Sequence, residues 1–309
     1  MSKITIIGSG RVGSTIAYSL TCREMATEIV IIDVNGEKAL GEALDIRQGL
    51  AYGSPCLVYA GNYEDAKDSD IVVITSGIAR QPGQSRLDLI NTNINIQKAI
   101  IPEITKKAPN AIYIIVSNPV DVLTYTFTKL SGIPENHIIG SGTVIDTARL
   151  RARLTEYCGL DSRNINAYVF GEHGDSSFIP WSISKIAEVP IAEYNNALCV
   201  TPIDEAAIEK YIKSSGAVII QRKGATYYAI ASTVSHICNA IIRDSRTAMT
   251  VSTLMHGEYG VDDVCLSTLK IVGKDGVLAG IHTPLNEEEV EKLKNSARVL
   301  REIIDKIAL

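Results

Sequence analysis

Short apolar runs alternate with amphipathic stretches through the first half of the chain. Most of the runs are rich in isoleucine and valine, and they occupy residues 3–8, 28–33, 70–75, 111–116 and 137–142. Residues 36–50 and 91–108, which lie between such runs, have helical periodicity. Runs that are apolar at almost every position are typical of strands buried on both faces of a parallel sheet. The pattern predicts a doubly wound α/β domain over residues 1–142.

The pattern changes after about residue 143. A helical stretch, DTARLRARLTEYCG, comes first, and strand-like pieces and then longer helical stretches follow. The last segment, 286–309, opens with NEEEVEKL, in which Asn286 can cap a helix and the glutamates favour its N-terminus. We expect a second domain, of the α+β class, over residues 143–309. The length of 309 residues agrees with two domains, because single cores rarely grow beyond about 250–300 residues.

Composition limits the partners of the chain more than its fold. The net charge is −5, and no apolar run approaches the roughly 18 residues of a membrane span. We therefore expect neither a membrane anchor nor a general attraction to nucleic acid, and local cations would have to hold any anionic ligand. The opening MSKITIIGSGRVG does not resemble a signal peptide, and the six cysteines contain no CxxC pair. These features favour a cytoplasmic protein with reduced thiols and no metal site.

A glycine-rich turn follows the first predicted strand. In IIGSGRVGSTIAYSL, Gly8, Gly10 and Gly13 have the GxGxxG spacing. Asp33 lies twenty residues after Gly13, at the end of the second predicted strand. Gly8 allows a tight turn, Gly10 allows a pyrophosphate to approach the backbone, and Gly13 allows helix and strand to pack closely. An acidic residue at the position of Asp33 accepts hydrogen bonds from a ribose diol and repels a 2′-phosphate, which predicts a Rossmann site for NAD; a structural turn beside an unrelated carboxylate is the alternative.

Candidate proton-transfer chemistry lies in the second half. His173 stands next to glycine in FGEHGDSS, where a ligand can come close. Asp146 and Arg149, in GTVIDTARLRARL, are three residues apart and would share one face of a helix. A carboxylate raises the pKa of a neighbouring imidazole, and an arginine can bind a carboxylate through two hydrogen bonds, so these residues could transfer a proton on an acidic substrate. From spacing alone, an ordinary helical ion pair between Asp146 and Arg149 remains the simpler interpretation.

Five motifs give the chain a resemblance to a known family. They are GSGRVG, SNPVDVLTY (117–125), GSGTVIDTARLR (140–151), GEHGDS (171–176) and KGATYYAIA (223–231), and they occur in the order seen in the lactate and malate dehydrogenase superfamily. The resemblance extends over essentially the whole chain. It implies a Rossmann domain followed by an α+β substrate domain, NAD as the cofactor, and hydride transfer between the nicotinamide and C2 of a small 2-oxo or 2-hydroxy acid.

The resemblance also implies roles for the residues around the reacting atoms. His173 would donate and accept the proton, and Asp146 would orient it. Arg149 would bind the C1 carboxylate of the substrate. Arg86 would polarise the carbonyl group from a segment, about 77–91, that resembles a lid over the substrate.

Further implied contacts concern the cofactor and the substrate side chain. Asn118 would hold the substrate and the nicotinamide, and Thr226 would lie against the substrate's side chain. The residues implied to bind NAD are Gly8, Gly10, Arg11, Val12, Gly13, Asp33, Asn93, Val116 and Asn118. Relatives of this type are commonly homotetramers, so we expect a homotetramer or homodimer that acts on a small molecule without a metal.

Arg80 indicates which acid is the substrate. It lies six residues before Arg86, where lactate dehydrogenases resemble one another in carrying glutamine and malate dehydrogenases carry arginine. Oxaloacetate has a second carboxylate that would pair with Arg80, whereas pyruvate would leave a buried guanidinium unpaired at a cost of about 3–5 kcal/mol. We therefore expect NAD-dependent interconversion of (S)-malate and oxaloacetate, the malate reaction of the tricarboxylic acid cycle. L-lactate dehydrogenase and a broader 2-hydroxy acid dehydrogenase are the alternatives, because GTVIDTARLR and KGATYYAIA look more like lactate dehydrogenases.

Two further interpretations concern regulation. Some bacterial lactate dehydrogenases bind fructose 1,6-bisphosphate between subunits through an arginine and a histidine. Arg151 matches the first position, but Asn166 occupies the second, which does not favour activation by this sugar phosphate. A nucleotide-binding regulatory protein without catalysis is a separate alternative, and the presence of every implied catalytic residue argues against it.

Overall fold

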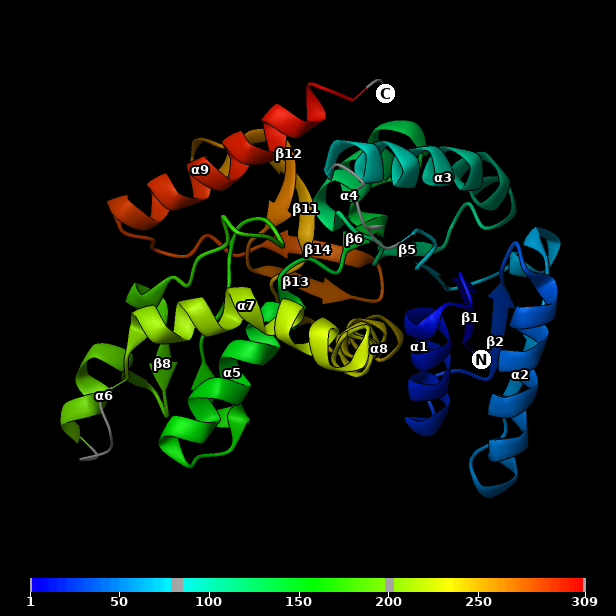
Figure 1. Cartoon of the computed structure of the whole chain (residues 1–309), viewed down its shortest axis with the longest axis horizontal. Helices are drawn as coiled ribbons and strands as arrows, with labels where there is room; N and C mark the ends of the chain where they lie inside the picture. The colour runs from blue at the N-terminus through cyan, green and yellow to red at the C-terminus, as the bar shows by residue number, and fades with distance from the viewer. Residues whose placement is uncertain (1, 79–85, 198–202, 308–309) are drawn as a thin grey trace.

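The computed structural model describes residues 2–78, 86–197 and 203–307. Within these ranges, eight strands form one large sheet in the order β3-β2-β1-β4-β5-β6-β11-β12 (Figure 1). β1 to β6 are parallel, β11 pairs antiparallel with β6, and β12 pairs antiparallel with β11. The strands are β1 Lys3–Ile7, β2 Glu28–Ile32, β3 Leu57–Ala60, β4 Ile71–Ile74, β5 Ile112–Ile115, β6 Ile138–Gly140, β11 Ser252–His256 and β12 Asp262–Ser267.

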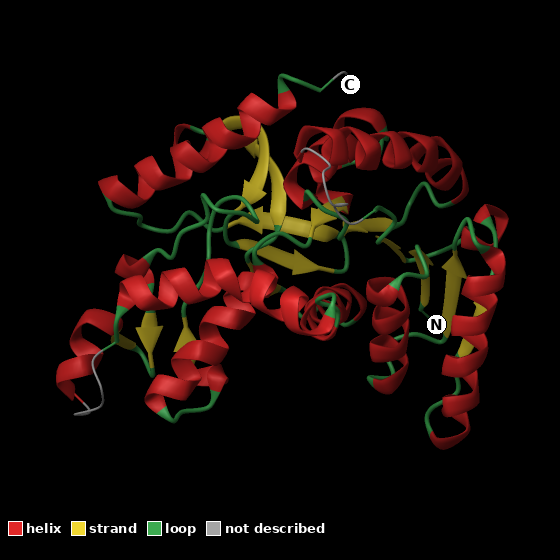
Figure 2. Ribbon diagram, in the orientation of Figure 1, coloured by secondary structure: helices red, strands yellow, loops and turns green. Residues whose placement is uncertain are grey.

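The apolar runs become the central strands of this sheet because both faces are covered. Alternate side chains of β4 enter two different cores: Val72 and Ile74 contribute to one, and Ile71 and Val73 to the other. The first core packs beneath α3 Arg86–Lys107, α4 Val120–Leu130 and α9 Glu287–Ile304. The second packs beneath α1 Arg11–Cys22, α2 Gly36–Gly49 and α8 Tyr228–Ile242, so helices lie on both sides of the sheet (Figure 2).

The second half of the chain adds smaller layers beside the large sheet. A third core lies between the helices α5 Val144–Cys158, α6 Ile191–Ala197 and α7 Glu205–Lys223 and the short strands β7 Ile165–Asn166, β8 Lys185–Ile186 and β9 Val189–Pro190. A second small sheet consists of β10 Thr247–Met249, β13 Lys270–Gly273 and β14 Gly276–Gly280.

Ser267, at the end of β12, joins the large sheet to two segments of the candidate site. Its backbone exchanges hydrogen bonds of 2.9 and 3.0 Å with Gly171. Its hydroxyl accepts a hydrogen bond of 3.0 Å from the backbone N–H of Thr143, immediately before α5. A side chain on Gly142 would overlap this hydroxyl, and Gly142 has a φ of +48°. The loop after Gly171 is therefore held against the first turn of α5.

The predicted fold class is confirmed, with a Rossmann sheet followed by α/β layers. The predicted cap is also confirmed, because the Asn286 side chain accepts a hydrogen bond from Glu289 N in a capping box at the start of α9. The expected order in the second half, a helix, then strands, then long helices, is found from α5 through β7 to β9 to α7 and α8, whereas the strands β10 to β14 before α9 were not expected. The division near residue 142 stays a prediction, and the large sheet extends across it through β11 and β12.

Candidate active site

The glycine-rich turn between β1 and α1 has three glycines with different surroundings. Gly8 has a φ of +106°, and a Cβ there would lie 2.7 Å from Thr75 Oγ1. A Cβ on Gly13 would overlap the carbonyl oxygen of Gly8, so this glycine is required where helix meets strand. A Cβ on Gly10 would have no described atom within 4 Å. The backbone at Gly10 is therefore open to a ligand at the N-terminus of α1, as a bound pyrophosphate requires.

Asp33 is fixed beside this turn at the end of β2. Its Oδ2 accepts hydrogen bonds from Ser9 N at 2.6 Å and from Ser9 Oγ at 2.9 Å, and its Oδ1 accepts one from Asn35 N at 2.9 Å. Partial burial raises the pKa of Asp33, but the hydrogen bonds from Asn35 and Ser9 outweigh it, so the pKa lies below its ordinary value. The turn thus presents an ionised carboxylate next to the open backbone of Gly10.

The other predicted cofactor residues divide into two groups. Val12, Asn93, Val116 and Asn118 line a cavity of about 500 Å³ at the carboxyl ends of the parallel strands. Arg11 does not line this cavity; it is exposed at the start of α1, and its guanidinium lies near the turn between α7 and α8.

Asn93 connects the elements around the cavity. Its side chain accepts a hydrogen bond of 2.8 Å from Ile78 N and donates one of 2.7 Å to Asn118 O. α3 is thereby tied both to the segment after β4 and to the segment after β5.

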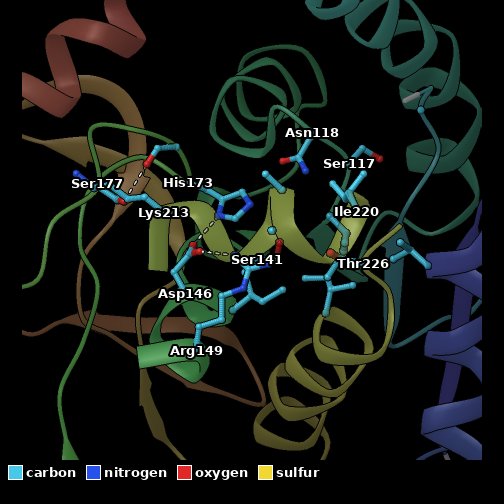
Figure 3. A pocket seen from close by; sticks show the side chains of 18 of the residues that line it. Ser117, Asn118, Ser141, Asp146, Arg149, His173, Ser177, Lys213, Ile220 and Thr226 are labelled. Carbon is cyan, nitrogen blue, oxygen red and sulfur yellow. Dashed lines mark hydrogen bonds and ion pairs between the residues drawn. The ribbon is translucent and has the colours of Figure 1, made fainter. Parts of the chain in front are cut away.

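The cavity also contains the predicted proton-transfer residues. His173 Nδ1 lies 2.6 Å from Asp146 Oδ2, and Arg149 Nη1 donates a hydrogen bond of 2.8 Å to Asp146 Oδ1 (Figure 3). Burial lowers the pKa of His173. The charge and hydrogen bond of Asp146 raise it by a larger amount, so the pKa lies above its ordinary value. Burial raises the pKa of Asp146, whereas His173 and Arg149 lower it to below its ordinary value. The geometry is that of a proton donor paired with an ionised carboxylate.

Two residues that line the cavity contain a buried polar atom without a described hydrogen-bond partner. Arg149 Nε and Thr226 Oγ1 are buried and have no hydrogen-bond partner among the described residues. α7 crosses the guanidinium at Gly216, whose Cβ would lie 3.4 Å from Arg149 Nη2. A buried donor without a partner is costly, so a substrate that bonds to these groups gains free energy.

Arg80 and the side chain of Arg86 lie outside the described residues. The structure therefore brings together His173, Asp146, Arg149, Asn118 and Thr226, and leaves the two lid arginines as predictions.

Two residues near the proton-transfer pair were not anticipated from the sequence, and only one of them lines the cavity. Asp121 accepts a hydrogen bond of 2.7 Å from the backbone N–H of His173, and Lys213 lines the cavity from α7. Asp121 belongs to the motif SNPVDVLTY, where it is the one acid in a largely apolar helix, and this was an available signal. Lys213 lies in a surface-like helical pattern and had no such signal.

At the position implied for a sugar phosphate, Arg151 and Asn166 bond to other parts of the protein. Arg151 Nε donates a hydrogen bond of 3.1 Å to Ala167 O, and its guanidinium lies 5.0 Å from the centre of the Tyr168 ring. Asn166 Nδ2 donates to Glu188 Oε1 at 2.9 Å, which brings an acid to the position of the expected histidine.

The described residues offer neither a metal site nor a membrane-spanning helix. No group of three or more His, Cys, Asp or Glu side chains in residues 2–78, 86–197 and 203–307 could hold a metal ion. Across the same ranges, none of the helices combines the length and apolar character needed to cross a bilayer.

Comparison with protein families gives a match to both halves of the chain. The model of the "lactate/malate dehydrogenase, NAD binding domain" matches residues 2–140, and that of the "lactate/malate dehydrogenase, alpha/beta C-terminal domain" matches residues 143–308. The chain belongs to the lactate/malate dehydrogenase family. The cofactor of this dehydrogenase is NAD, and the open backbone at Gly10 and the fixed carboxylate of Asp33 fit it.

Three relatives of the dehydrogenase are L-lactate dehydrogenases. L-lactate dehydrogenase 1 of Clostridium acetobutylicum is 47% identical over 308 residues, which cover 99% of this chain and 98% of that protein. L-lactate dehydrogenase of Thermoanaerobacterium saccharolyticum is 44% identical over 310 residues, which cover 99% of each. The crystal structure of the minor L-lactate dehydrogenase of Enterococcus mundtii superposes with a TM-score of 0.96 at 36% identity, and covers 100% of this chain and 99% of that one.

These comparisons overturn the prediction of malate dehydrogenase. The named relatives and structural neighbours of the dehydrogenase are L-lactate dehydrogenases, so the malate reaction and its place in the tricarboxylic acid cycle are wrong. The prediction depended on one side chain, Arg80. The similarity to lactate dehydrogenases, in contrast, extends along the full length of the chain.

Replacement of Asp33 tests the cofactor site of the dehydrogenase. We expect the wild type to use NADH with a higher kcat/KM than NADPH, and Asp33→Ser to reduce that ratio about tenfold, or about 1.4 kcal/mol, because the repulsion of a 2′-phosphate is removed. Steady-state rates with both cofactors measure the ratio. Asp45→Ser is the control, since it removes an exposed acid from α2 with the same change in net charge. Equal use of the two cofactors by the wild type would contradict the assignment.

Proposed function

We propose that the protein is an NAD-dependent L-lactate dehydrogenase, which reduces pyruvate to L-lactate and catalyses the reverse reaction. The observation that carries the proposal is the chain of hydrogen bonds from Arg149 through Asp146 to His173 at the wall of a cavity beside the glycine-rich turn. This arrangement suits a small 2-oxo acid. The lactate dehydrogenases that span the whole length of the chain favour pyruvate as that acid.

Substrate binding in this proposal uses the groups that the protein itself leaves unpartnered. The guanidinium of Arg149 binds the C1 carboxylate through two hydrogen bonds, and its buried Nε gains a partner. Asn118 bonds to the substrate from the segment after β5, and Thr226 lies against its side chain. Arg86, from the lid segment, polarises the C2 carbonyl group.

Proton transfer depends on the pairing of His173 with Asp146. Bound NADH supplies the hydride that C2 of pyruvate receives. As C2 accepts the hydride, the carbonyl oxygen takes the proton from Nε2 of His173, because Nδ1 is held by Asp146. The products are L-lactate and NAD⁺, and the imidazole is left neutral. Reduction therefore requires protonated His173 and oxidation requires neutral His173, and the raised pKa of His173 favours reduction at neutral pH.

The choice of substrate is tested by rates with pyruvate and with oxaloacetate under identical conditions. We expect kcat/KM for pyruvate to exceed that for oxaloacetate by about tenfold or more, a difference of about 1.4 kcal/mol between transition states. NADH oxidation followed by absorbance measures both. A preference for oxaloacetate would overturn the assignment to lactate.

Replacement of His173 tests the proton donor. We expect His173→Asn to lower kcat by about 10²–10⁴-fold, because the carbonyl oxygen then has no positioned acid. NADH binding, followed by fluorescence, should remain within about twofold, since the substitution leaves the glycine-rich turn and Asp33 unchanged. His256→Asn is the control, because that histidine is exposed and pairs with Glu135 outside the cavity. Near-normal turnover in His173→Asn would assign the proton to another group.

We also propose a cytoplasmic enzyme that assembles as a homotetramer or homodimer. The cysteines that support a reducing compartment are free thiols: Cys22, Cys56, Cys158, Cys238 and Cys265. Apolar side chains are exposed on the adjoining helices α1, α2 and α8, with Tyr18 at 56%, Leu40 at 44% and Tyr228 at 66%, and they offer an assembly surface. Native disulfides in the purified protein would argue against the compartment.

Light scattering at micromolar concentration tests the assembly. We expect a mass of two or four chains of 33.4 kDa. A monomer mass would contradict the proposal.

A further inference from the structure

Asp121 contacts the catalytic histidine without lining the substrate cavity. It is in the first turn of α4, which follows β5, and its side chain is 3% exposed. Its Oδ2 accepts a hydrogen bond of 2.7 Å from the backbone N–H of His173. Asp121 does not line the cavity, so it is not placed to touch the substrate or the cofactor.

His173 therefore forms hydrogen bonds with two carboxylates, which come from two different helices. Asp146, on α5, bonds to its ring, and Asp121, on α4, bonds to its backbone. Arg149 neutralises one of the two acids through its bond to Asp146. Among the described residues, no charged residue other than His173 bonds to Asp121. A buried carboxylate is stable only if a charge or hydrogen bonds compensate it. A hydrogen bond from Ser252, the hydrogen bond from the backbone N–H of His173 and the charge of the imidazolium together supply that compensation.

We infer that Asp121 is a positioning residue that sets the proton affinity of His173. Its charge stabilises the imidazolium, and its hydrogen bond holds the backbone of the 171–177 loop. The inference rests on the proposed function for its kinetic consequences. Its electrostatic part concerns His173 alone and does not depend on which acid is the substrate.

Several charged groups face this pair, and their effects differ in sign. Asp146 and Asp121 raise the pKa of His173, and Arg149 lowers it. Glu172, the neighbour of His173 in sequence, raises the pKa of Asp121, whereas His173 lowers it. Lys213 and Asp175 lie at the cavity lining, on the substrate side of the imidazole.

The protonation state of Asp121 determines where in the pH range the effect appears. Burial raises the pKa of Asp121 to about 6. Above that pH the carboxylate is charged and favours protonated His173. Below that pH it becomes neutral and its influence is lost. An amide at position 121 should therefore change the enzyme above about pH 6 and leave it unchanged below.

The test is the pH dependence of Asp121→Asn, which keeps an acceptor for His173 N and removes the charge. For pyruvate reduction, which needs the imidazolium, we expect the limb that falls with rising pH to move down by about one pH unit. For lactate oxidation, which needs the neutral imidazole, the rising limb should move down by the same amount. The two enzymes should converge in acid. Asp68→Asn is the control, because it removes an exposed acid with the same change in net charge, at a φ of +61° that asparagine tolerates.

A uniform loss of kcat/KM at every pH, with both limbs unmoved, would show a merely structural role and overturn the inference. An NMR titration of the His173 imidazole, assigned by its absence in His173→Asn, provides a readout without substrate. We expect the Asp121→Asn signal to titrate about one pH unit below that of the wild type. An imidazole that titrates at the same pH in the wild type and in Asp121→Asn would contradict the inference. If pyruvate is not reduced but the imidazole titration shifts, the proposed function fails and the inference stands.

Discussion

The continuation of the parallel sheet into an antiparallel pair is the constraint on which the site depends. β11 adds to the edge of β6, and β12 follows it, which carries Ser267 to the point where α5 begins. Ser267 forms hydrogen bonds with both Thr143 and Gly171. Asp146 and His173 follow these two residues closely in the sequence. The segments that carry these two side chains, 2.6 Å apart, are therefore both held by hydrogen bonds to Ser267, one to its hydroxyl and the others to its backbone.

Charge compensation is the second requirement, and it links stability to chemistry. Asp146 is buried and remains ionised because His173 and Arg149 bond to it. The wall of the cavity contains the opposite case, since Arg149 Nε and Thr226 Oγ1 are buried without described partners. An unsatisfied buried donor costs stability, and in the proposed function the substrate supplies partners to Arg149 and Thr226.

Much of the fold could be predicted from the sequence because its signals are local. The apolar runs indicate strands covered on both faces, and the glycine spacing with Asp33 indicates the turn for a dinucleotide. The edge strand β3 and the pair β11 and β12 gave weaker signals, since only Val58 of β3 is buried and β12 opens with two acids. Asp121 was not anticipated because its role depends on a contact across 52 residues of sequence. The substrate was predicted wrongly because a single lid arginine was weighted above similarity spread along the whole chain.

The pairing of β6 with β11 also bears on how the molecule can be divided. Residues 1–142 contain a complete dinucleotide turn and six parallel strands, and would look like an independent module. Without the second half, β6 would become an open edge, with Ile138 and Ile139, both buried in the whole chain, next to unpaired backbone groups. Exposed apolar edges of this kind template strand addition between molecules. A fragment cut after residue 142 would expose this edge, which the C-terminal half covers in the whole chain.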